Sequence, residues 1–220
     1  MEKNKVYCGD ALNLIDELDV EPNLIILHPP DLSETPYNLE EYKGFLDTIY
    51  SKCFEKMSKN GVLASINTDR KINGAVYLKH LDIVNVMGMN PFNYKIWCKS
   101  LKSNLYILTY AHMMFFRKGK NVNNKASEYF PDVWVLKSDK IGGYKMKDSF
   151  PSELIRRIVM NFTNPGDLIL DPFLGSGKTG RVAIQTGRDY VGFEIDPDNV
   201  TIAESVISSI EPQISSANLS

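Results

Sequence analysis

The sequence predicts an α/β domain in which a mostly parallel, seven-stranded sheet is covered by helices on both faces. Short apolar runs typical of buried strands alternate along the chain with longer segments of helical periodicity, an order typical of parallel sheets. The chain has 220 residues, of which 43% are hydrophobic, and this is enough for one large core. We therefore expect a single domain over residues 1–210, followed by a flexible tail over residues 211–220.

The expected elements follow the alternation along the chain. Seven apolar segments have the length and composition of strands, and they are residues 5–8, 24–27, 62–67, 94–98, 112–116, 168–171 and 190–193. Six segments have helical periodicity, and they are residues 11–18, 39–59, 75–87, 152–162, 177–186 and 200–209. Helix 39–59 carries an apolar stripe that indicates core packing, and Ser152 is expected to cap helix 152–162.

A buried strand runs directly into a glycine-rich turn at residues 171–177, DPFLGSG. The spacing Gly175-x-Gly177-x-x-Gly180 places backbone N–H groups and a helix N-terminus beside a nucleotide-like ligand. Glu194, which directly follows the next strand, can accept hydrogen bonds from two ribose hydroxyls. These features indicate a nucleoside cofactor.

Three further hypotheses for this turn compete with a nucleoside site. A P-loop would need glycine where the chain has Pro172, whose ring fixes φ and removes an N–H donor. A dinucleotide-dependent dehydrogenase normally carries the turn on its first strand and needs a longer chain after it. A turn that merely lets a helix pack closely against the sheet is the structural alternative.

Several motifs, in order, resemble those of the permuted DNA amino-methyltransferases, in which the catalytic half precedes the half that binds S-adenosylmethionine (SAM). The turn 171–177 resembles the SAM loop of that family, and residues 7–12 and 23–30 resemble its opening strand and catalytic strand. Residues 94–99 and 113–118 resemble its later strands, and residues 150–155 resemble the helix start before the SAM loop. The resemblance implies a circularly permuted, Rossmann-like SAM-dependent methyltransferase fold.

The resemblance also divides the chain into a catalytic half at about residues 1–118, a short target-recognition insert at about 119–148 and a SAM-binding half at about 149–210. Phe173 is expected beside the methionine moiety of SAM, with Asp171 near its amino group, and Asp10 near the adenine. Asp10 could equally serve as a helix cap. The full set of residues expected to bind SAM is Asp10, Phe150, Pro151, Asp171, Pro172, Phe173, Gly175, Ser176, Gly177, Thr179 and Glu194.

The catalytic turn implied by the resemblance is His28-Pro29-Pro30-Asp31. In the family, an Asp, Asn or Ser side chain and the first proline carbonyl accept the hydrogens of the amino group, and an aromatic residue stacks on a flipped-out base. Neutral His28 can still accept a hydrogen bond but protonated His28 cannot, so activity is expected to fall at acidic pH. Asp31 cannot stack on a base, a role open to Tyr37 or Phe92.

This departure from the family pattern leaves three classes of function open. The first is an active DNA adenine or cytosine amino-methyltransferase. The second is an altered enzyme that acts on another base or acceptor, and the third is an inactive SAM- or DNA-binding homologue that serves as a regulatory subunit. The shortness of the insert further predicts a short or relaxed target sequence, or help from a partner subunit or a second copy in a homodimer.

Charge favours a DNA partner, double- or single-stranded, only in one part of the chain. The net charge is −2, yet residues 83–127 hold several lysines and no Asp or Glu, interleaved with aromatic residues. The residues expected to contact DNA are Tyr37, Lys95, Lys99, Lys102, Arg117, Lys118 and Lys120. Lysines that merely keep exposed sheet edges soluble are the alternative.

Two classes of protein are not expected from this sequence. Three widely spaced cysteines suggest neither a disulfide framework nor a zinc site, so no metal is expected. The longest apolar runs are too short to span a membrane, and the first residues lack a hydrophobic signal core. We therefore expect a cytoplasmic protein.

Overall fold

A computed structural model describes residues 1–72, 74–100, 108–120, 130–137, 139 and 150–209. The predicted tail, Lys102 and most of the predicted insert lie outside the described residues. The main sheet contains β1 (Lys5–Cys8), β2 (Leu24–Leu27), β3 (Val62–Asn67), β6 (Asn93–Cys98), β7 (Tyr110–Arg117), β8 (Val133–Val135), β9 (Leu168–Asp171) and β10 (Asp189–Glu194). The α-helices are α1 (Ala11–Leu14), α2 (Leu39–Lys56), α3 (Lys79–Met87), α4 (Ser152–Phe162), α5 (Lys178–Gln185) and α6 (Pro197–Ser208).

The strand order is β1-β10-β9-β2-β3-β7-β6-β8. The first five strands in this order are parallel, β7 is antiparallel to both of its neighbours, and β8 is parallel to β6. The N-terminal strand β1 pairs with β10, and β2 pairs with β9. The first half of the chain therefore completes the sheet of the second half, as the permuted order predicts.

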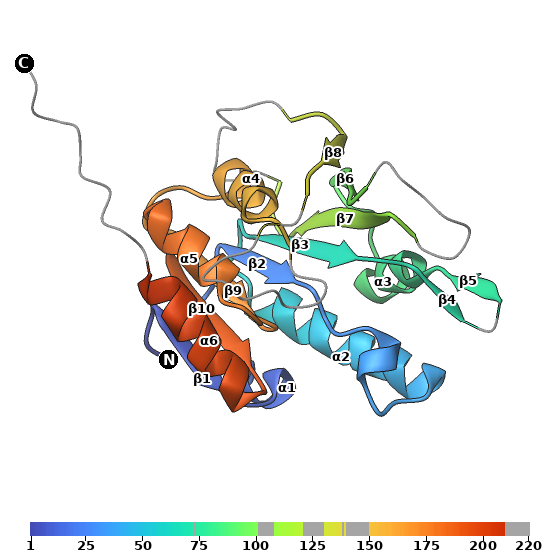
Figure 1. Cartoon of the computed structure of the whole chain (residues 1–220), viewed down its shortest axis with the longest axis horizontal. Helices are drawn as coiled ribbons and strands as arrows, with labels where there is room; N and C mark the ends of the chain where they lie inside the picture. Colours follow the sequence, from blue (N-terminus) through green and yellow to red (C-terminus); the bar gives the residue numbers. More distant parts are fainter. Residues whose placement is uncertain (73, 101–107, 121–129, 138, 140–149, 210–220) are drawn as a thin grey trace, which may run out of the picture.

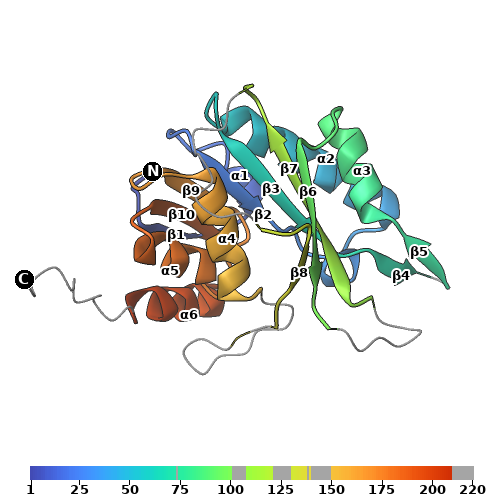
Figure 2. The same cartoon turned by 90° about the horizontal axis from the view of Figure 1, so that it is seen from above.

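Helices cover both faces of the sheet, as predicted (Figures 1 and 2). On one face, α4, α5 and α6 bury residues such as Ile158, Val182 and Ala203 against the sheet. On the other face, α2 and α3 bury the predicted apolar stripe, which includes Tyr50, together with Ile83. Successive β2 residues alternate between the two cores because side chains along a strand point to opposite faces. In the part of the chain described, no helix is both long and apolar enough to cross a bilayer.

The structure corrects the predicted strand count and one predicted helix. Among the residues that the structure describes, the sheet has eight strands rather than seven, because the three-residue β8 adds to its edge beside β6. Residues 75–77, predicted as the start of a helix, instead form β5 (Ala75–Tyr77), which pairs with β4 (Arg70–Ile72) in a hairpin. Three-residue strands carry too little periodicity to be distinguished in a sequence, and their pairing depends on the neighbouring strand.

Candidate cofactor and catalytic site

A cavity of about 510 Å³ lies at the carboxyl ends of the central parallel strands. Nine of the residues predicted to bind SAM line it, namely Asp10, Phe150, Asp171, Pro172, Phe173, Gly175, Ser176, Thr179 and Glu194. His28 and Pro30 of the predicted catalytic turn, together with Tyr37, line the same cavity. Most of the predicted SAM site and two residues of the predicted catalytic turn therefore lie in one cavity, at the edge where open α/β sheets bind ligands, whereas Pro29 and Asp31 do not line it.

Asp171 fixes the turn between β9 and α5. Its carboxylate accepts hydrogen bonds from the backbone N–H of Phe173 at 3.0 Å and from Oγ1 of Thr179 at 2.6 Å. Burial raises the pKa of Asp171 to about 6, and nearby Glu194 acts in the same direction, whereas the two hydrogen bonds oppose the shift. A carboxylate with a raised pKa inside a cavity is suited to receive a cationic group of a ligand.

Gly177 and Pro151, also predicted to bind SAM, do not line the cavity. Gly177 has φ +80° and precedes α5, and a Cβ there would lie 2.7 Å from the backbone oxygen of Ala203. Its role is therefore to let α5 and α6 approach each other. Pro151 precedes the first residue of α4, and Asp139 accepts a hydrogen bond from the backbone N–H of Ser152 at 3.1 Å. The predicted cap by Ser152 is therefore wrong, because Ser152 is the first residue of α4 and the N-cap position is Pro151.

Lys178 follows Gly177 in the sequence that superficially resembles a P-loop. Its Nζ donates hydrogen bonds to the carboxylate of Asp139 at 2.8 Å and to the carbonyl of Phe150 at 2.8 Å. The lysine therefore holds the segment before α4 against α5. This arrangement agrees with the rejection of a phosphate-binding loop.

Two further carboxylates, besides that of Asp171, are among the groups that line the cavity. Glu194 accepts hydrogen bonds from the backbone N–H groups of Gly175 and Asp196, at 2.9 and 3.0 Å. Asp10 accepts one from the N–H of Leu12 at 2.8 Å, which confirms its role as a helix cap, and it also lines the cavity. SAM offers an ammonium group, ribose hydroxyls and an adenine amino group, and a carboxylate can accept hydrogen bonds from each of them, so this cavity fits the cofactor.

His28 follows β2 and lies half-buried at the cavity wall. Its ring meets Phe150 edge to face, with 4.5 Å between ring centroids. Burial lowers the pKa of His28 to about 3, and the positive charges of Lys79, Lys99 and Arg70 act in the same direction, whereas Asp31 opposes them. The imidazole is therefore neutral at ordinary pH, where one of its ring nitrogens can accept a hydrogen bond.

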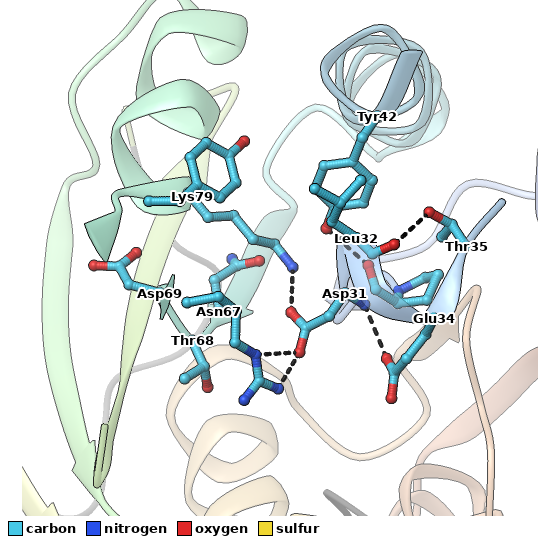
Figure 3. A network of polar contacts seen from close by, with 12 residues as sticks. Asp31, Leu32, Glu34, Thr35, Tyr42, Asn67, Thr68, Asp69 and Lys79 are labelled. Carbon is cyan, nitrogen blue, oxygen red and sulfur yellow. Dashed lines mark hydrogen bonds and ion pairs between the residues drawn. The ribbon is translucent and has the colours of Figure 1, made fainter. Parts of the chain in front are cut away.

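Asp31 does not line the cavity, and its carboxylate instead takes part in a network of ion pairs (Figure 3). Its carboxylate accepts hydrogen bonds from Nζ of Lys79 at 3.2 Å and from Nε of Arg70 at 2.6 Å. Burial alone would raise the pKa of Asp31, but the charges of Lys79 and Arg70 hold it below the usual value. The residue where the family has an aromatic side chain thus anchors the turn.

Backbone contacts fix the same turn. The N–H of Asp31 donates to the carboxylate of Glu34 at 2.9 Å, and the hydroxyl of Tyr42 donates to the carbonyl of Pro30 at 2.8 Å. Both contacts lie within the close-up of Figure 3. The turn is thereby held from α2, from the 3₁₀ helix at Leu32–Glu34 and from the β4–β5 hairpin.

Of the two aromatic candidates for base stacking, only Tyr37 lies at the cavity. Tyr37 is 37% exposed and its ring centroid is 5.7 Å from that of Phe45, which also lines the cavity. Phe92 contacts Phe162 instead, with the guanidinium of Arg117 over its ring.

The structure does not bring the predicted DNA-contacting residues onto one surface. Lys99 lies near the carboxyl end of β3, where its Nζ bonds Oγ1 of Thr68 at 3.0 Å, and Lys95 pairs with Asp132 at 2.6 Å. β7 runs antiparallel to β3, so Arg117 lies beside Val62 at the opposite edge of the sheet. Lys118 lies at the same edge, where its Nζ donates hydrogen bonds to the carbonyls of Glu55 and Met57. Exposed Lys120 comes two residues later. The contact of these residues with DNA stays a prediction, and the described ones lie at both ends of the strands.

Sequence reasoning missed several residues of the site. Arg70 and Lys79 were not singled out because they lie 39 and 48 positions from Asp31, with no local motif around them. Phe45 was assigned to the core stripe, yet it lines the cavity and meets Phe173 at 6.2 Å between centroids. Glu34 could have been found from its three-residue spacing to Asp31, which forms a capping box.

Comparison with known families identifies the chain. The N6/N4 methyltransferase family, described as DNA methylase, matches residues 23–205. The chain belongs to this family. It is accordingly a SAM-dependent DNA amino-methyltransferase, of the type that modifies N6 of adenine or N4 of cytosine.

Sequence relatives agree with this family and differ in length. The chain is 25% identical to the type II methyltransferase M.BglII of Bacillus subtilis over 93% of its own length and 69% of the relative. It is 32% identical to M.MjaI of Methanocaldococcus jannaschii over 70% of its length and 64% of the relative. It is 26% identical to M1.MboII of Moraxella bovis over 96% of its length and 99% of the relative.

Solved structures share the fold. The cytosine-N4-specific PvuII DNA methyltransferase superposes with a TM-score of 0.80 at 17% identity, covering 98% of this chain and 89% of that one. A DNA modification methylase of Thermus thermophilus, TTHA0409, complexed with S-adenosyl-L-methionine, superposes with a TM-score of 0.71 at 23% identity over 92% and 94% of the two chains. These similarities establish the methyltransferase fold for a chain with a divergent catalytic turn.

Proposed function

We propose that this DNA methyltransferase is catalytically active and that His28 and the carbonyl of Pro29 orient the amino group of the target base. The single observation that carries the proposal is that His28 and the SAM loop line one cavity. A methyl donor bound by the loop and an amino group held by the turn would then meet inside it. Positioning of two reactants in this way supplies a large part of catalysis.

The chemistry demands an acceptor of hydrogen bonds at position 28. The lone pair of an exocyclic amino group is delocalised into the base, and acceptors for both amino hydrogens localise it on nitrogen. Neutral His28 offers one ring nitrogen and the Pro29 carbonyl offers an oxygen. Bound SAM supplies a methyl group activated by the sulfonium, and the amino proton can leave after transfer.

The remaining residues of the turn take supporting roles in this proposal. Tyr37 stacks on the flipped-out base from the exposed side of the cavity. Asp31 acts as a positioning residue, because its ion pairs with Lys79 and Arg70 hold the turn on which His28 lies. Asp31, at the position where the family has a stacking aromatic residue, thus holds the turn in place, and Tyr37 stacks on the base instead.

We further propose that DNA binds at the edge of the sheet where the cavity and Lys99 lie. DNA then does not contact the opposite edge, where Arg117, Lys118 and Lys120 lie. Target recognition depends on a segment of about thirty residues, 119–148, and part of this segment, β8, belongs to the sheet. We therefore propose that the target sequence is short, or that a second copy or a partner subunit contributes to its recognition. We also propose that the protein acts in the cytoplasm, where the DNA of bacteria and archaea lies.

The test is titration of the purified protein with SAM by calorimetry, followed by transfer of labelled methyl groups to double- and single-stranded DNA and nucleoside analysis. The His28→Ala variant should keep SAM binding and lose about 10²-fold in transfer rate. Glu40→Gln, in an exposed ion pair with Lys43, is the matched control and should behave as the wild type. Equal transfer by His28→Ala and wild type would reject the role of His28.

A second candidate is a homologue that binds SAM and DNA but acts on another acceptor or serves as a regulatory subunit. The observation that favours it is Asp31, whose ion-paired carboxylate replaces the stacking residue. SAM binding without transfer to any DNA substrate would select this candidate. Absence of SAM binding would reject both candidates together.

A further inference from the structure

Two histidines and an aspartate converge next to the catalytic turn, outside the cavity. Asp69 follows β3, His80 is the second residue of α3, and His112 lies on β7. Nδ1 of His80 lies 2.9 Å from a carboxylate oxygen of Asp69, and Nε2 of His112 lies 3.0 Å from the same carboxylate. One ligand atom from each residue falls within 4.8 Å of the others.

The donor set suits a transition-metal ion. Two imidazole nitrogens and one carboxylate form a set found in zinc sites with three protein ligands, and tetrahedral bonds of about 2.0–2.2 Å place neighbouring donors about 3.3–3.6 Å apart. The observed separations of 2.9 and 3.0 Å are those of hydrogen bonds, so the side chains would move apart slightly to admit the ion. Asp69 is 1% and His112 7% exposed, whereas the His80 side chain is 19% exposed, which leaves a side from which water can complete the coordination.

A further contact orients one of the ligands. The hydroxyl of Tyr94 forms a hydrogen bond with Nδ1 of His112, the ring nitrogen on the far side from Asp69. If Nδ1 carries the proton, the lone pair of Nε2 points toward Asp69 and is available to a metal. Such partners on the second nitrogen are the usual companions of metal-binding histidines.

We propose that Asp69, His80 and His112 bind a divalent transition-metal ion of the zinc type, and that this ion fastens the base of the β4–β5 hairpin. Asp69 immediately precedes β4, and His80 comes three residues after β5 ends. The ion joins these two ends of the hairpin to β7 in the main sheet. Its role is structural, and it takes no part in transferring the methyl group.

The position of the site links it to the catalytic turn. Arg70 and Lys79, whose side chains hold Asp31, are the sequence neighbours of Asp69 and His80. A metal that fixes Asp69 and His80 thereby fixes the backbone from which both cations reach Asp31. Occupancy of the site should order the turn that carries His28.

The competing hypothesis is a metal-free cluster in which both histidines donate N–H groups to Asp69. The test is a titration of the untagged protein, stripped with a chelator, with zinc chloride by calorimetry, together with metal analysis after dialysis. Cobalt(II) serves as a second probe, because its visible absorption reports the coordination of the bound ion. We expect one equivalent of tightly bound zinc and a cobalt spectrum that zinc abolishes.

Three variants and one control decide the assignment. His80→Gln and Asp69→Asn should each weaken zinc binding by at least about 10²-fold, and Tyr94→Phe by about 10-fold, since changes to the partners of metal ligands typically cost about 10–100-fold. Asp132→Asn, a carboxylate in an exposed ion pair with Lys95, is the control and should bind zinc as the wild type does. SAM binding by each variant reports that it is folded, because none of these residues lines the cavity.

Two results would overturn the proposal. One is wild-type protein that retains less than one equivalent of zinc and gives no cobalt spectrum, which would establish the hydrogen-bonded cluster. The other is zinc binding that survives in folded His80→Gln and Asp69→Asn. Neither readout depends on methyl transfer, so the outcome is independent of the proposed function.

Discussion

Replacing Asp31 with alanine should destabilise the protein strongly, because it leaves Lys79 as an unpaired charge in the interior. The Lys79 side chain is 1% exposed and Asp31 is its ion-pair partner at 3.2 Å. Breaking a buried pair by removing one partner typically costs about 3–5 kcal/mol. The Arg70 side chain is 39% exposed, so its pair with Asp31 should add no more than about 1 kcal/mol.

The assay is urea unfolding at pH 7 followed by far-UV circular dichroism. Asp132→Ala is the matched control, since Asp132 pairs with Lys95 but its own side chain is 84% exposed. Loss of this surface pair should cost about 0–1 kcal/mol. The double variant Asp31→Ala/Lys79→Met removes both buried charges and should recover most of the loss.

Two results would refute this reasoning. A loss below about 1 kcal/mol for Asp31→Ala would show that Lys79 is not held as a buried charge. A double variant no more stable than the single one would show that the loss comes from elsewhere in the turn. The pH dependence gives a further check: the native pKa of Asp31 is lowered, so its contribution is present above the unfolded pKa of about 3.9 and is lost as pH falls through the native value.

Three further predictions concern the cavity and its turn. Asp171→Asn should weaken SAM binding in calorimetry yet raise the urea midpoint of unfolding at pH 8. The native pKa of Asp171, about 6, exceeds the unfolded value, so the ionised side chain lowers the stability by up to about 3 kcal/mol above pH 6. An unchanged midpoint would contradict this prediction. Methyl transfer should show no ionisation of His28 between pH 5 and 8, because its pKa is about 3; an inflection near pH 6.5 that His28→Ala removes would count against the assignment. Gly177→Ala should lower the free energy of unfolding in urea by about 1–3 kcal/mol, since φ is +80° and the new Cβ would contact Ala203. The control Gly44→Ala, which has open space around it in α2, should raise that free energy by about 0.5–1 kcal/mol. Equal effects of the two substitutions would exclude strain at Gly177.

Much of the fold was predictable because local signals and long-range packing agree. β2, β3 and β9 have the predicted bounds, since each is a short, mostly apolar run that is buried along its whole length. The SAM loop was recognisable because its function depends on residues adjacent in sequence, from Asp171 to Thr179. β8 and the β4–β5 hairpin were missed because three-residue strands gain their stability from pairing.

The partners of Asp31 and the three residues Asp69, His80 and His112 could not be paired from sequence. Each group comes from separate elements, and its members meet only when those elements lie against one another. The low pKa of His28 likewise depends on burial and on cations from distant segments. Local composition contains none of this information, because charges interact through space.

The sequence by itself determined the class of fold, the permuted order of the halves and the cofactor loop, since these depend on periodicity and on contiguous motifs. Only the tertiary structure decided at which edge of the sheet each end of a strand lies. β7 runs antiparallel to β3, which moves Arg117 and Lys118 to the edge opposite His28, although the same residues on a parallel strand would lie beside it. Strand direction is set by packing and connection, and the side-chain alternation that reveals a strand is the same in both directions.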